Sequence, residues 1–337
     1  MANATVRGRF LWHELMTADT KSAASFFSKV VGWKTQAWEH DPSYTTFIAN
    51  GRPMAGLMVL PGDAKAMGAP PSWLTYIGTP DVDEAARQAA SLGGKILKAA
   101  ADIPTIGRFA VIQDPQGAVF AAFTPNRGPE SESEPVIGDF SWHELPTTDW
   151  RAAVTFYQQL FGWEPTSSMD MGPEMGTYQM YGLKGKTLGG MFNKPKQMAG
   201  PPAWLPYIMV ADSKKAAATV KKLGGQVVNG PMEVPGGGWI AQGVDLQGAM
   251  FAVHSAKPVA TKKAAGARPV KGAAVREPAE TKVAGRAAAT RPTEAKKAGG
   301  KKRPAAKKRP AAAKKRPTVK KRPAAAKRRP AAKKRRR

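Results

Sequence analysis

The sequence predicts an α+β protein of two tandem domains followed by a basic tail. Three observations lead to this prediction. The segment Trp12-His13-Glu14-Leu15 returns as Trp142-His143-Glu144-Leu145, and the sequence around each copy is similar. Each copy opens the same expected order of one strand, one helix and three strands. The charge of the chain also changes sharply after residue 256.

The excess positive charge lies in the tail. Residues 257–337 contain 31 Lys and Arg and 3 Asp and Glu, a net charge of +28. The chain totals of 52 basic and 25 acidic residues leave 21 and 22 in residues 1–256, a net charge of −1. The tail has no Phe, Trp or Tyr. It therefore cannot bury enough apolar surface to offset an ordering entropy of roughly 1–2 kcal/mol per residue, and we expect it to be disordered.

The first domain is predicted to consist of two βαβββ units. Apolar residues at 9–15 indicate a strand, and Thr17 or Asp19 is placed to cap a helix that Gly32 ends. Turn signals separate the strands expected at 34–39, 44–49 and 54–60. After a Gly- and Pro-rich loop at 61–71, the second unit is predicted as a strand at 73–78, a helix at 81–92 and strands at 95–99, 108–113 and 118–123.

The second domain repeats this pattern. The segment PPSWLTYIGTPD at 70–81 returns as PPAWLPYIMVAD at 201–212, and DPQGAVFAAF at 114–123 returns as DLQGAMFAVH at 245–254. We therefore place the first domain at 1–125, a Pro-, Ser- and Glu-rich linker at 126–137, the second domain at 138–256 and the tail at 257–337.

Several classes of protein are disfavoured by composition. The chain has no Cys, so it has neither a disulfide framework nor thiol chemistry. No signal peptide is evident, and no apolar run approaches the roughly 20 residues of a membrane span. These features favour a cytoplasmic protein.

The two domains resemble the vicinal oxygen chelate superfamily, which includes glyoxalases, bleomycin-resistance proteins and extradiol dioxygenases. The resemblance covers about residues 9–125 and 139–255. It rests on aromatic pairs before Gly-Trp, on Leu-Gly-Gly helix ends and on an Asp-Pro-Gln-Gly turn: Phe26-Phe27, Gly32-Trp33, Phe156-Tyr157, Gly162-Trp163 and Asp114-Pro115-Gln116-Gly117. It implies that the two βαβββ units of each domain join their sheets into one cupped mixed sheet. It does not imply one activity, because the superfamily contains isomerases, dioxygenases, thiol transferases and binding proteins.

The resemblance also implies where metal ligands would lie in metal-using members. Those positions are occupied in this chain by residues that cannot hold a metal ion: Trp12, Leu74, Ala121, Trp142, Leu205 and Ala252. Metal ligands in proteins are His, Cys or carboxylate side chains. We therefore expect no metal or other cofactor, with a divalent metal as the alternative.

Strand alternation predicts which residues face each cup. If Trp12 faces the cup of the first domain, so does Glu14, while His13 faces the opposite side. We expect His13 and His143 to be partly buried structural residues, with a metal role as the alternative. The predicted cup residues are Trp12, Glu14, Tyr76 and Phe123 in the first domain and Trp142, Glu144, Tyr207 and His254 in the second. Their aromatic content suits a hydrophobic or aromatic small molecule, and it would equally suit an ordinary core.

Glu14 and Glu144 are the candidate catalytic residues. A carboxylate in an apolar cup has its pKa raised by desolvation and can serve as a general base. The other interpretations are that each glutamate contacts a ligand, or that it only accepts hydrogen bonds from Tyr76 or Tyr207 and fixes the sheet.

The tail is predicted to bind nucleic acid without sequence preference. Basic triplets recur every six or seven residues and nearly all are followed by Pro, which favours extended segments. Cations spread along such a segment suit the phosphate backbone, and no aromatic residue is present to stack on bases. The tail resembles the Lys-, Ala- and Pro-rich tails of linker histones and bacterial histone-like proteins. The alternatives are a solubilising tail or a binder of RNA, polyphosphate or acidic membranes. The predicted DNA contacts are Lys301, Lys302, Arg303, Lys307, Lys308, Arg309, Lys314, Lys315, Arg316, Lys320, Lys321, Arg322, Lys327, Arg328 and Arg329.

Two functions from different classes follow. The first is a metal-free small-molecule-binding protein that its tail holds on the nucleoid. The second is an enzyme, either a lyase, an isomerase or a dioxygenase, that uses one cup while the tail only localises it.

Overall fold

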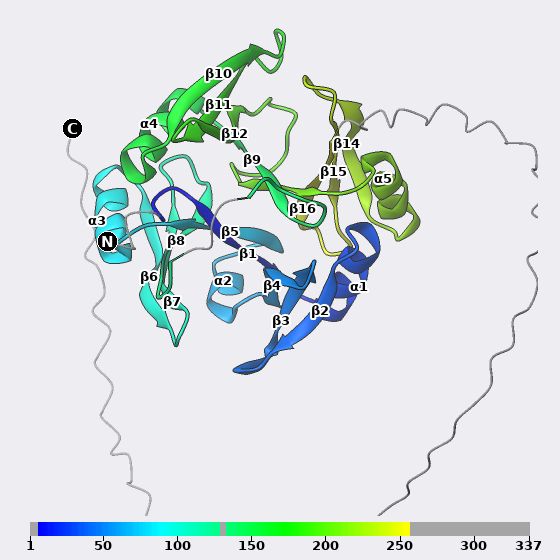
Figure 1. Ribbon diagram of the computed structural model, residues 1–337. Coiled ribbons are helices and arrows are strands. Elements are labelled where there is room, and N and C mark those ends of the chain that lie inside the picture. The colour runs from blue at the N-terminus through cyan, green and yellow to red at the C-terminus, as the bar shows by residue number, and fades with distance from the viewer. Residues whose placement is uncertain (1–5, 129–132, 257–337) are drawn as a thin grey trace, which may run out of the picture. The chain divides into compact units, whose positions relative to one another are not determined.

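The computed structural model describes residues 6–128 and 133–256, and these form two eight-stranded mixed sheets. The first sheet and its helices are blue to cyan in Figure 1. Its elements are β1 (Phe10–Thr17), α1 (Thr20–Val30), β2 (Lys34–Trp38), β3 (Asp41–Ala49), β4 (Arg52–Val59), α2 (Gly62–Ala66), β5 (Ser72–Gly78), α3 (Val82–Ser91), β6 (Lys95–Ile103), β7 (Gly107–Gln113) and β8 (Val119–Pro125).

The second sheet repeats the first without a counterpart of α2. Its elements are β9 (Phe140–Thr147), α4 (Trp150–Phe161), β10 (Glu164–Asp170), β11 (Thr177–Leu183), β12 (Lys186–Asn193), β13 (Leu205–Met209), α5 (Ser213–Lys222), β14 (Gln226–Glu233), β15 (Trp239–Val244) and β16 (Met250–Ser255). No helix in the described ranges is long and apolar enough to span a membrane.

The strand order confirms the predicted fold class of two domains, each built from paired βαβββ units. The first sheet has the order β2-β3-β4-β1-β5-β8-β7-β6, and the second has the order β10-β11-β12-β9-β13-β16-β15-β14. In each sheet the two units meet through the antiparallel pairing of their first strands, β1 with β5 and β9 with β13. The predicted loop at 61–71 differs in one respect, because α2 forms within it. Its Asp-Ala-Lys-Ala run contains good helix formers, which explains this short helix.

Aspartates begin the four longer helices. Asp19, Asp81, Asp149 and Asp212 each have extended backbone, and each side chain accepts a hydrogen bond from a backbone N–H of the first turn. These bonds satisfy donors that have no partner within the helix. α4 ends at Gly162, whose φ of 74° places it in the left-handed region.

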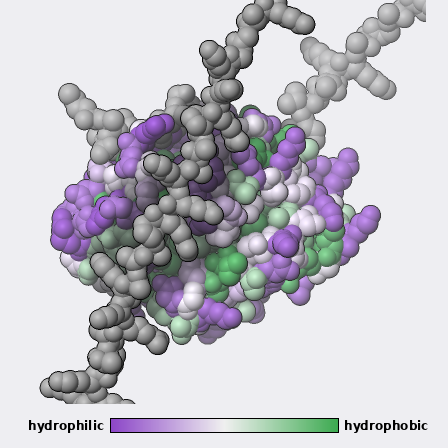
Figure 2. Space-filling model, turned by 90° about the horizontal axis from the view of Figure 1, so that it is seen from below, coloured by the Kyte–Doolittle hydropathy of each residue, from purple (hydrophilic) through white to green (hydrophobic). Residues whose placement is uncertain are grey.

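The two sheets pack against each other through two apolar cores that both domains share. One core joins α1 and the inner residues of β1, β3 and β4 to α5, β13 and β16. The other joins α3, β7 and β8 to α4, β9 and β12. In Figure 1 the helices accordingly lie in pairs, α1 beside α5 and α3 beside α4. On the face shown in Figure 2, hydrophobic residues form only small patches among hydrophilic ones. Burial of apolar surface in the two cores stabilises the contact between the sheets.

Buried tryptophans connect the domains at two equivalent places. Trp33 Nε1 donates to the carbonyl of Gly138 at 2.8 Å, and Trp163 Nε1 donates to the carbonyl of Gly8 at 2.7 Å. Both glycines have positive φ, 77° at Gly8 and 96° at Gly138. A Cβ at Gly138 would lie 2.6 Å from the Cβ of Ala49, so a side chain does not fit there.

Each domain also holds the first helix of the other. The side chain of Gln247, in the turn before β16, contacts the Thr17 hydroxyl and the backbone N–H and carbonyl of Asp19. Gln116, in the turn before β8, makes the same contacts to Thr147 and Asp149. The Asp-x-Gln-Gly turns that mark the sequence repeat are therefore reciprocal contacts between domains.

His13 and His143 meet between the two sheets. Their Nε2 atoms lie 2.8 Å apart, and only 4% and 6% of these residues are exposed. Phe140 stacks on His13 and Phe10 stacks on His143, with ring centroids 3.6 and 3.5 Å apart. Burial lowers the pKa of His13, and it lowers the pKa of His143 to about 3. Both rings are therefore neutral at neutral pH, and one donates to the other.

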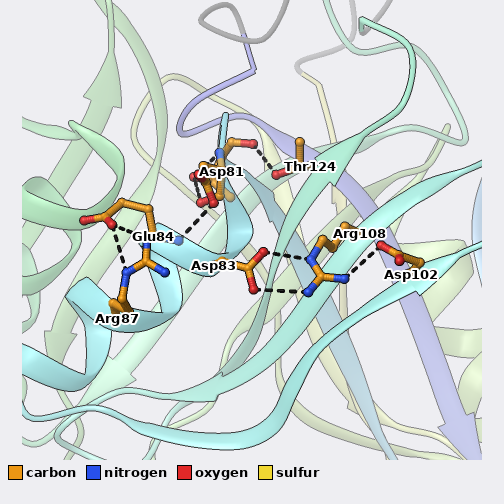
Figure 3. A network of polar contacts seen from close by, with 8 residues as sticks. Asp81, Asp83, Glu84, Arg87, Asp102, Arg108 and Thr124 are labelled. Carbon is orange, nitrogen blue, oxygen red and sulfur yellow. Dashed lines mark hydrogen bonds and ion pairs between the residues drawn. The ribbon is translucent and has the colours of Figure 1, made fainter.

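The two domains differ where α3 and α5 begin. Figure 3 shows Arg108 of β7 between Asp83 and Asp102, with ion-pair distances of 2.8 and 2.9 Å. In the second domain, Lys214 stands at the position of Asp83 and Trp239 at the position of Arg108. The Lys214 ammonium lies 3.4 Å from the centre of the indole. An ion pair is thus replaced by a cation–π contact at the same place.

A buried hydrogen-bond chain is present in one half of the core and incomplete in the other. Trp204 Nε1 donates to the Tyr157 hydroxyl at 3.1 Å, and this hydroxyl donates to Asp114 Oδ2 at 3.0 Å. The counterpart of Tyr157 is Phe27, which has no hydroxyl. The equivalent atoms, Trp73 Nε1 and Asp245 Oδ2, are buried and have no hydrogen-bond partner among the described residues.

This difference predicts opposite effects of exchanging the two aromatic residues. Tyr157→Phe should lower the free energy of unfolding by about 1–3 kcal/mol, because it leaves two buried polar groups unsatisfied. Phe27→Tyr should raise it by about 1 kcal/mol, because it supplies the hydroxyl that Trp73 and Asp245 lack. Urea unfolding of both variants and the wild type measures the two changes. A loss of stability in Phe27→Tyr as large as that in Tyr157→Phe would contradict the assignment.

Candidate ligand-binding cups

The two candidate sites lie on the sheet faces opposite the histidine pair. We call them cup one, the face of the first sheet that carries Trp12 and Glu14, and cup two, the face of the second sheet that carries Trp142 and Glu144. The predicted alternation along β1 and β9 agrees with the contacts. Glu14 bonds to Tyr76 on one side of its strand, and His13 bonds to His143 on the other.

In cup one, two tyrosines bind the carboxylate of Glu14. The Tyr44 hydroxyl donates to Oε1 at 2.8 Å and the Tyr76 hydroxyl donates to Oε2 at 3.0 Å. Trp12 Nε1 in turn donates to the Tyr44 hydroxyl at 3.0 Å. A Cβ on Gly56 would lie 1.7 Å from the Tyr44 hydroxyl, so glycine at this position lets the ring lie against β4.

Cup two repeats this arrangement and adds a third donor. The hydroxyls of Tyr178 and Tyr207 donate to Glu144 Oε2 at 3.0 and 3.1 Å. Gln242 Nε2 donates to Glu144 Oε1 at 3.0 Å. Trp142 Nε1 donates to the Tyr178 hydroxyl at 2.9 Å, and Gly190 leaves the space that this ring occupies.

The two cups differ on β7 and β15. Val111 of cup one and Gln242 of cup two are equivalent residues. Val111 pairs with Ala121, and Gln242 pairs with Ala252 at the same place in the second sheet. Lys98 pairs with Val111, and Asn229 pairs with Gln242. Glu14 therefore has a lysine in its surroundings where Glu144 has two amides. The polar group of cup two is the more completely hydrogen-bonded of the two.

Burial raises the pKa of both glutamates. Desolvation is the largest cause at each, and the hydrogen bonds from tyrosine act against it. The pKa of Glu144 rises to about 7. Desolvation and the neighbouring glutamates also raise the pKa of Tyr76 and Tyr207, so these hydroxyls stay protonated and act as donors. A carboxyl that titrates near neutral pH can accept or release a proton.

The remaining predicted cup residues form the apolar surroundings. Tyr76 and Phe123 pack edge to face at 5.9 Å and belong to one cluster with Leu74 and Ala121. Leu205, Tyr207 and Ala252 form the corresponding cluster in cup two, with Trp142 against it. His254 is half-buried at the end of β16, where its Nδ1 lies 3.2 Å from the Ser141 hydroxyl. Burial lowers the pKa of His254.

The cups do not fit a divalent metal. The positions that the superfamily resemblance assigns to ligands carry indole, isobutyl and methyl side chains, none of which coordinates a metal ion. Glu14 and Glu144 each lie among tyrosines, and each is the one carboxylate of its hydrogen-bonded group. Across residues 6–128 and 133–256, no three His, Cys, Asp or Glu side chains gather as a ligand set.

Three residues of these networks were missed from the sequence. Tyr44, Tyr178 and Gln242 bond directly to the glutamates or to their partners. The repeat contained a signal for the two tyrosines, namely a glycine on the neighbouring strand in each domain. Gly56 and Gly190 leave the space that the tyrosine rings occupy. No comparable signal existed for Gln242, because its counterpart is Val111.

The family model described as Glyoxalase/Bleomycin resistance protein/Dioxygenase superfamily matches residues 9–121 and, a second time, residues 140–252. The chain belongs to this superfamily. The expected membership is therefore confirmed, and both copies of the domain are present.

Two relatives align with this chain over nearly their whole length. The chain is 31% identical over 254 residues to "Putative glyoxylase CFP32" of Mycobacterium bovis, a match that covers 73% of this chain and 94% of that protein. It is 29% identical over 256 residues to "Anthracycline biosynthesis protein DauV" of Streptomyces sp. strain C5, a match that covers 72% of this chain and 91% of that protein.

Solved structures of dioxygenases share the fold at low sequence identity. The 2,2',3-trihydroxybiphenyl 1,2-dioxygenase of Sphingomonas wittichii strain RW1 has a TM-score of 0.52 and 12% identity, over 74% of this chain and 90% of the enzyme. The 2,3-dioxygenase LapB of Pseudomonas sp. KL28 has a TM-score of 0.51 and 12% identity, over 75% of this chain and 94% of the enzyme. At this identity the likeness shows the fold of the superfamily and not its chemistry.

The raised pKa of Glu144 predicts a specific pH dependence of stability. Its pKa of about 7 in the folded chain lies above the value of 4.5 for an unperturbed glutamate, so the folded state holds the proton more tightly. The associated stability is fully present below about pH 4.5 and is lost as the pH rises through about 7. Since one pKa unit corresponds to about 1.36 kcal/mol, this stability amounts to about 3 kcal/mol.

Urea unfolding between pH 4.5 and 8 tests this prediction. Glu144→Gln should reduce the loss of stability with rising pH and leave the part that comes from Glu14, whereas Glu174→Gln, at an exposed glutamate, should leave the whole loss in place. The lowered pKa of His143 acts in the opposite direction below about pH 6.5, so the difference between variant and wild type is the quantity to compare. Parallel curves for Glu144→Gln and the wild type would contradict the prediction.

Proposed function

We propose that this chain is a metal-free small-molecule-binding member of the superfamily that is held on DNA by its basic tail. The observation that carries the first part is the identity of the residues at the expected ligand positions. Trp12, Leu74 and Ala121 in cup one, with their counterparts in cup two, provide no donor for a metal ion.

The chemistry of the cups supports a hydrophobic or aromatic ligand with one polar group. Aromatic and aliphatic side chains surround each buried glutamate, and the tyrosine hydroxyls hold each carboxyl in place. Sites for small molecules commonly combine an apolar lining with a few fixed polar groups. A carboxyl that is protonated near neutral pH can donate to a ligand oxygen, and an ionised one can accept from a ligand hydroxyl. The relative named for anthracycline biosynthesis is consistent with a polycyclic aromatic ligand.

A lyase, isomerase or dioxygenase acting in one cup is the second candidate. The observation that favours it is the pKa of about 7 at Glu144, which suits a general acid or base at neutral pH. Cup two is the better candidate for such a role, because Gln242 and two tyrosines fix the carboxyl within it. A dioxygenase would also require a redox centre, for which the cups provide no ligand set.

The proposed binding to DNA depends on the basic tail. It lies outside the described residues, so the support is its sequence, with a net charge of +28 over residues 257–337. Cations spaced along an extended chain displace counterions from the phosphate backbone, which gives strong and salt-sensitive binding without sequence preference. We infer a cytoplasmic protein associated with the nucleoid.

Ligand binding without metal is tested on the purified full-length chain. Metal analysis should find far less than one zinc, iron, nickel or manganese ion per chain. Equilibrium dialysis against 1-naphthol should show binding that EDTA does not change and that Glu144→Ala weakens about tenfold, because the fixed polar group is lost. Stoichiometric metal that disappears in Glu14→Ala or His143→Ala, together with EDTA-sensitive binding, would refute the metal-free proposal.

DNA binding is tested by comparing the full chain with a chain that ends at residue 256. The full chain should retain random-sequence duplex DNA in a filter-binding assay, and the affinity should fall by 10³-fold or more between 50 and 200 mM salt if six or more phosphates are neutralised. The shortened chain should show no retention while its urea unfolding midpoint stays unchanged. Equal retention by both chains would show that the tail is not the DNA-binding element.

A further inference from the structure

One end of cup two carries a polar pair that cup one lacks. The Ser141 hydroxyl, on β9, lies 3.2 Å from Nδ1 of His254, on β16, and both residues are half-buried. The sequence repeat places Leu11 at the position of Ser141 and Phe123 at the position of His254. An apolar pair in one half of the molecule is therefore replaced by a hydroxyl and an imidazole in the other.

A bulge at the start of β9 turns Ser141 toward cup two. The register of β9 against β13 shifts between residues 140 and 142, which makes Ser141 the extra residue. The same shift occurs in β1 at Leu11, whose side chain packs against the apolar cluster of cup one. His254 comes two residues after Ala252 of the corresponding cluster in cup two, so strand alternation places it on the same face. The hydroxyl and the imidazole therefore meet at the edge of an apolar lining.

The second ring nitrogen of His254 is left without a protein partner. In the described part of the chain, the ring bonds to Ser141 alone, through Nδ1. A Cβ on Gly238 would lie 2.8 Å from Nε2, so glycine at this position keeps side-chain atoms away from that nitrogen. Gly107 leaves the same space beside the Phe123 ring of the first domain. An unpaired polar atom beside apolar side chains is unfavourable unless water or a ligand bonds to it.

The pair can present either a donor or an acceptor to a ligand. Burial lowers the pKa of His254, so the ring is neutral at physiological pH and has one N–H. When the Ser141 hydroxyl donates to Nδ1, the N–H is on Nε2. When this hydroxyl turns toward the Tyr207 carbonyl, 3.5 Å away, Nδ1 donates to the serine oxygen and Nε2 accepts. A hydroxyl or carbonyl oxygen of a ligand suits these two states.

We propose that cup two binds a neutral aromatic ligand with oxygen groups at opposite ends, one at Glu144 and the other, a hydroxyl or a carbonyl, at Nε2 of His254. Tyr207, which donates to Glu144, pairs with Ala252 on β16. His254 lies two residues further along that strand, or roughly 7 Å. The two polar points are therefore separated on one face of the sheet, as a ligand with an oxygen group at each end requires.

The two cups then take different ligands. Leu11 and Phe123 offer no hydrogen bond at the corresponding end of cup one, so a second oxygen group would be buried there without a partner. Cup one therefore favours a ligand whose far end is apolar. This inference rests on the proposed binding of small molecules in the cups, and it adds which ligand cup two selects.

Isothermal titration of the full-length chain with three naphthalene derivatives tests the proposal. The compounds are 2-naphthol, 2,6-dihydroxynaphthalene and 6-acetyl-2-naphthol, which are uncharged at neutral pH, so the basic tail does not attract them. One of the two disubstituted compounds should bind one site per chain about tenfold more tightly than 2-naphthol, because its second oxygen bonds to His254. Tighter binding of the diol identifies a hydroxyl as the natural group, and tighter binding of the ketone identifies a carbonyl.

The sequence repeat supplies the variant that removes the second polar point. His254→Phe introduces the residue of cup one, and it should abolish the tenfold gain while changing the affinity for 2-naphthol by less than about twofold. His40→Phe makes the same substitution at an exposed histidine and should retain the gain.

Two results overturn the proposal in different ways. No gain from either second group, or a gain that persists in His254→Phe, overturns this inference and leaves the binding function of the cups in place. Absence of any binding that Glu144→Ala weakens overturns this inference together with the proposed function.

Discussion

The hydrogen bond between His13 and His143 determines how the two domains can be arranged. It joins the central strands of both sheets at a point where neither ring is exposed. Two buried imidazoles that share one hydrogen bond require one donor and one acceptor, so the accepting ring must be neutral. Burial lowers the pKa of both rings and keeps the donor neutral as well. The faces of β1 and β9 that carry them are committed to the contact between domains. The glutamates that follow are turned, by strand alternation, into the cups.

The pseudo-symmetry of the chain allows its specialised features to be recognised by comparing equivalent positions. Several contacts between domains occur twice, including the tryptophan bonds to Gly8 and Gly138 and the glutamine contacts to the helix starts. Against this background, differences are informative. Cup two has Gln242 where cup one has Val111, and Lys186 and Arg9 stand in one half where Arg52 and Asp139 form an ion pair in the other. Function that belongs to only one half should be sought at these positions.

The sequence predicted the fold well because its signals are local. Helix caps, Gly-Gly ends and alternating strands lie within a few residues of the elements they define, and the repeat allowed each to be found twice. The orientation of Glu14 and His13 followed from alternation alone. Three donors to the glutamates did not, because Tyr44, Tyr178 and Gln242 approach from other strands at a distance of 30 or more residues.

The shared cores and reciprocal glutamine contacts make this chain equivalent to a two-fold dimer whose subunits have been joined by a peptide. In a true homodimer every substitution would appear in both subunits, so both cups would have to change together. Covalent joining keeps the partner at a high effective concentration and allows each half to mutate alone. One half can then retain the contacts that hold the molecule together while the other acquires new chemistry. Two fused domains can divide their functions in this way, whereas the two identical subunits of a homodimer cannot.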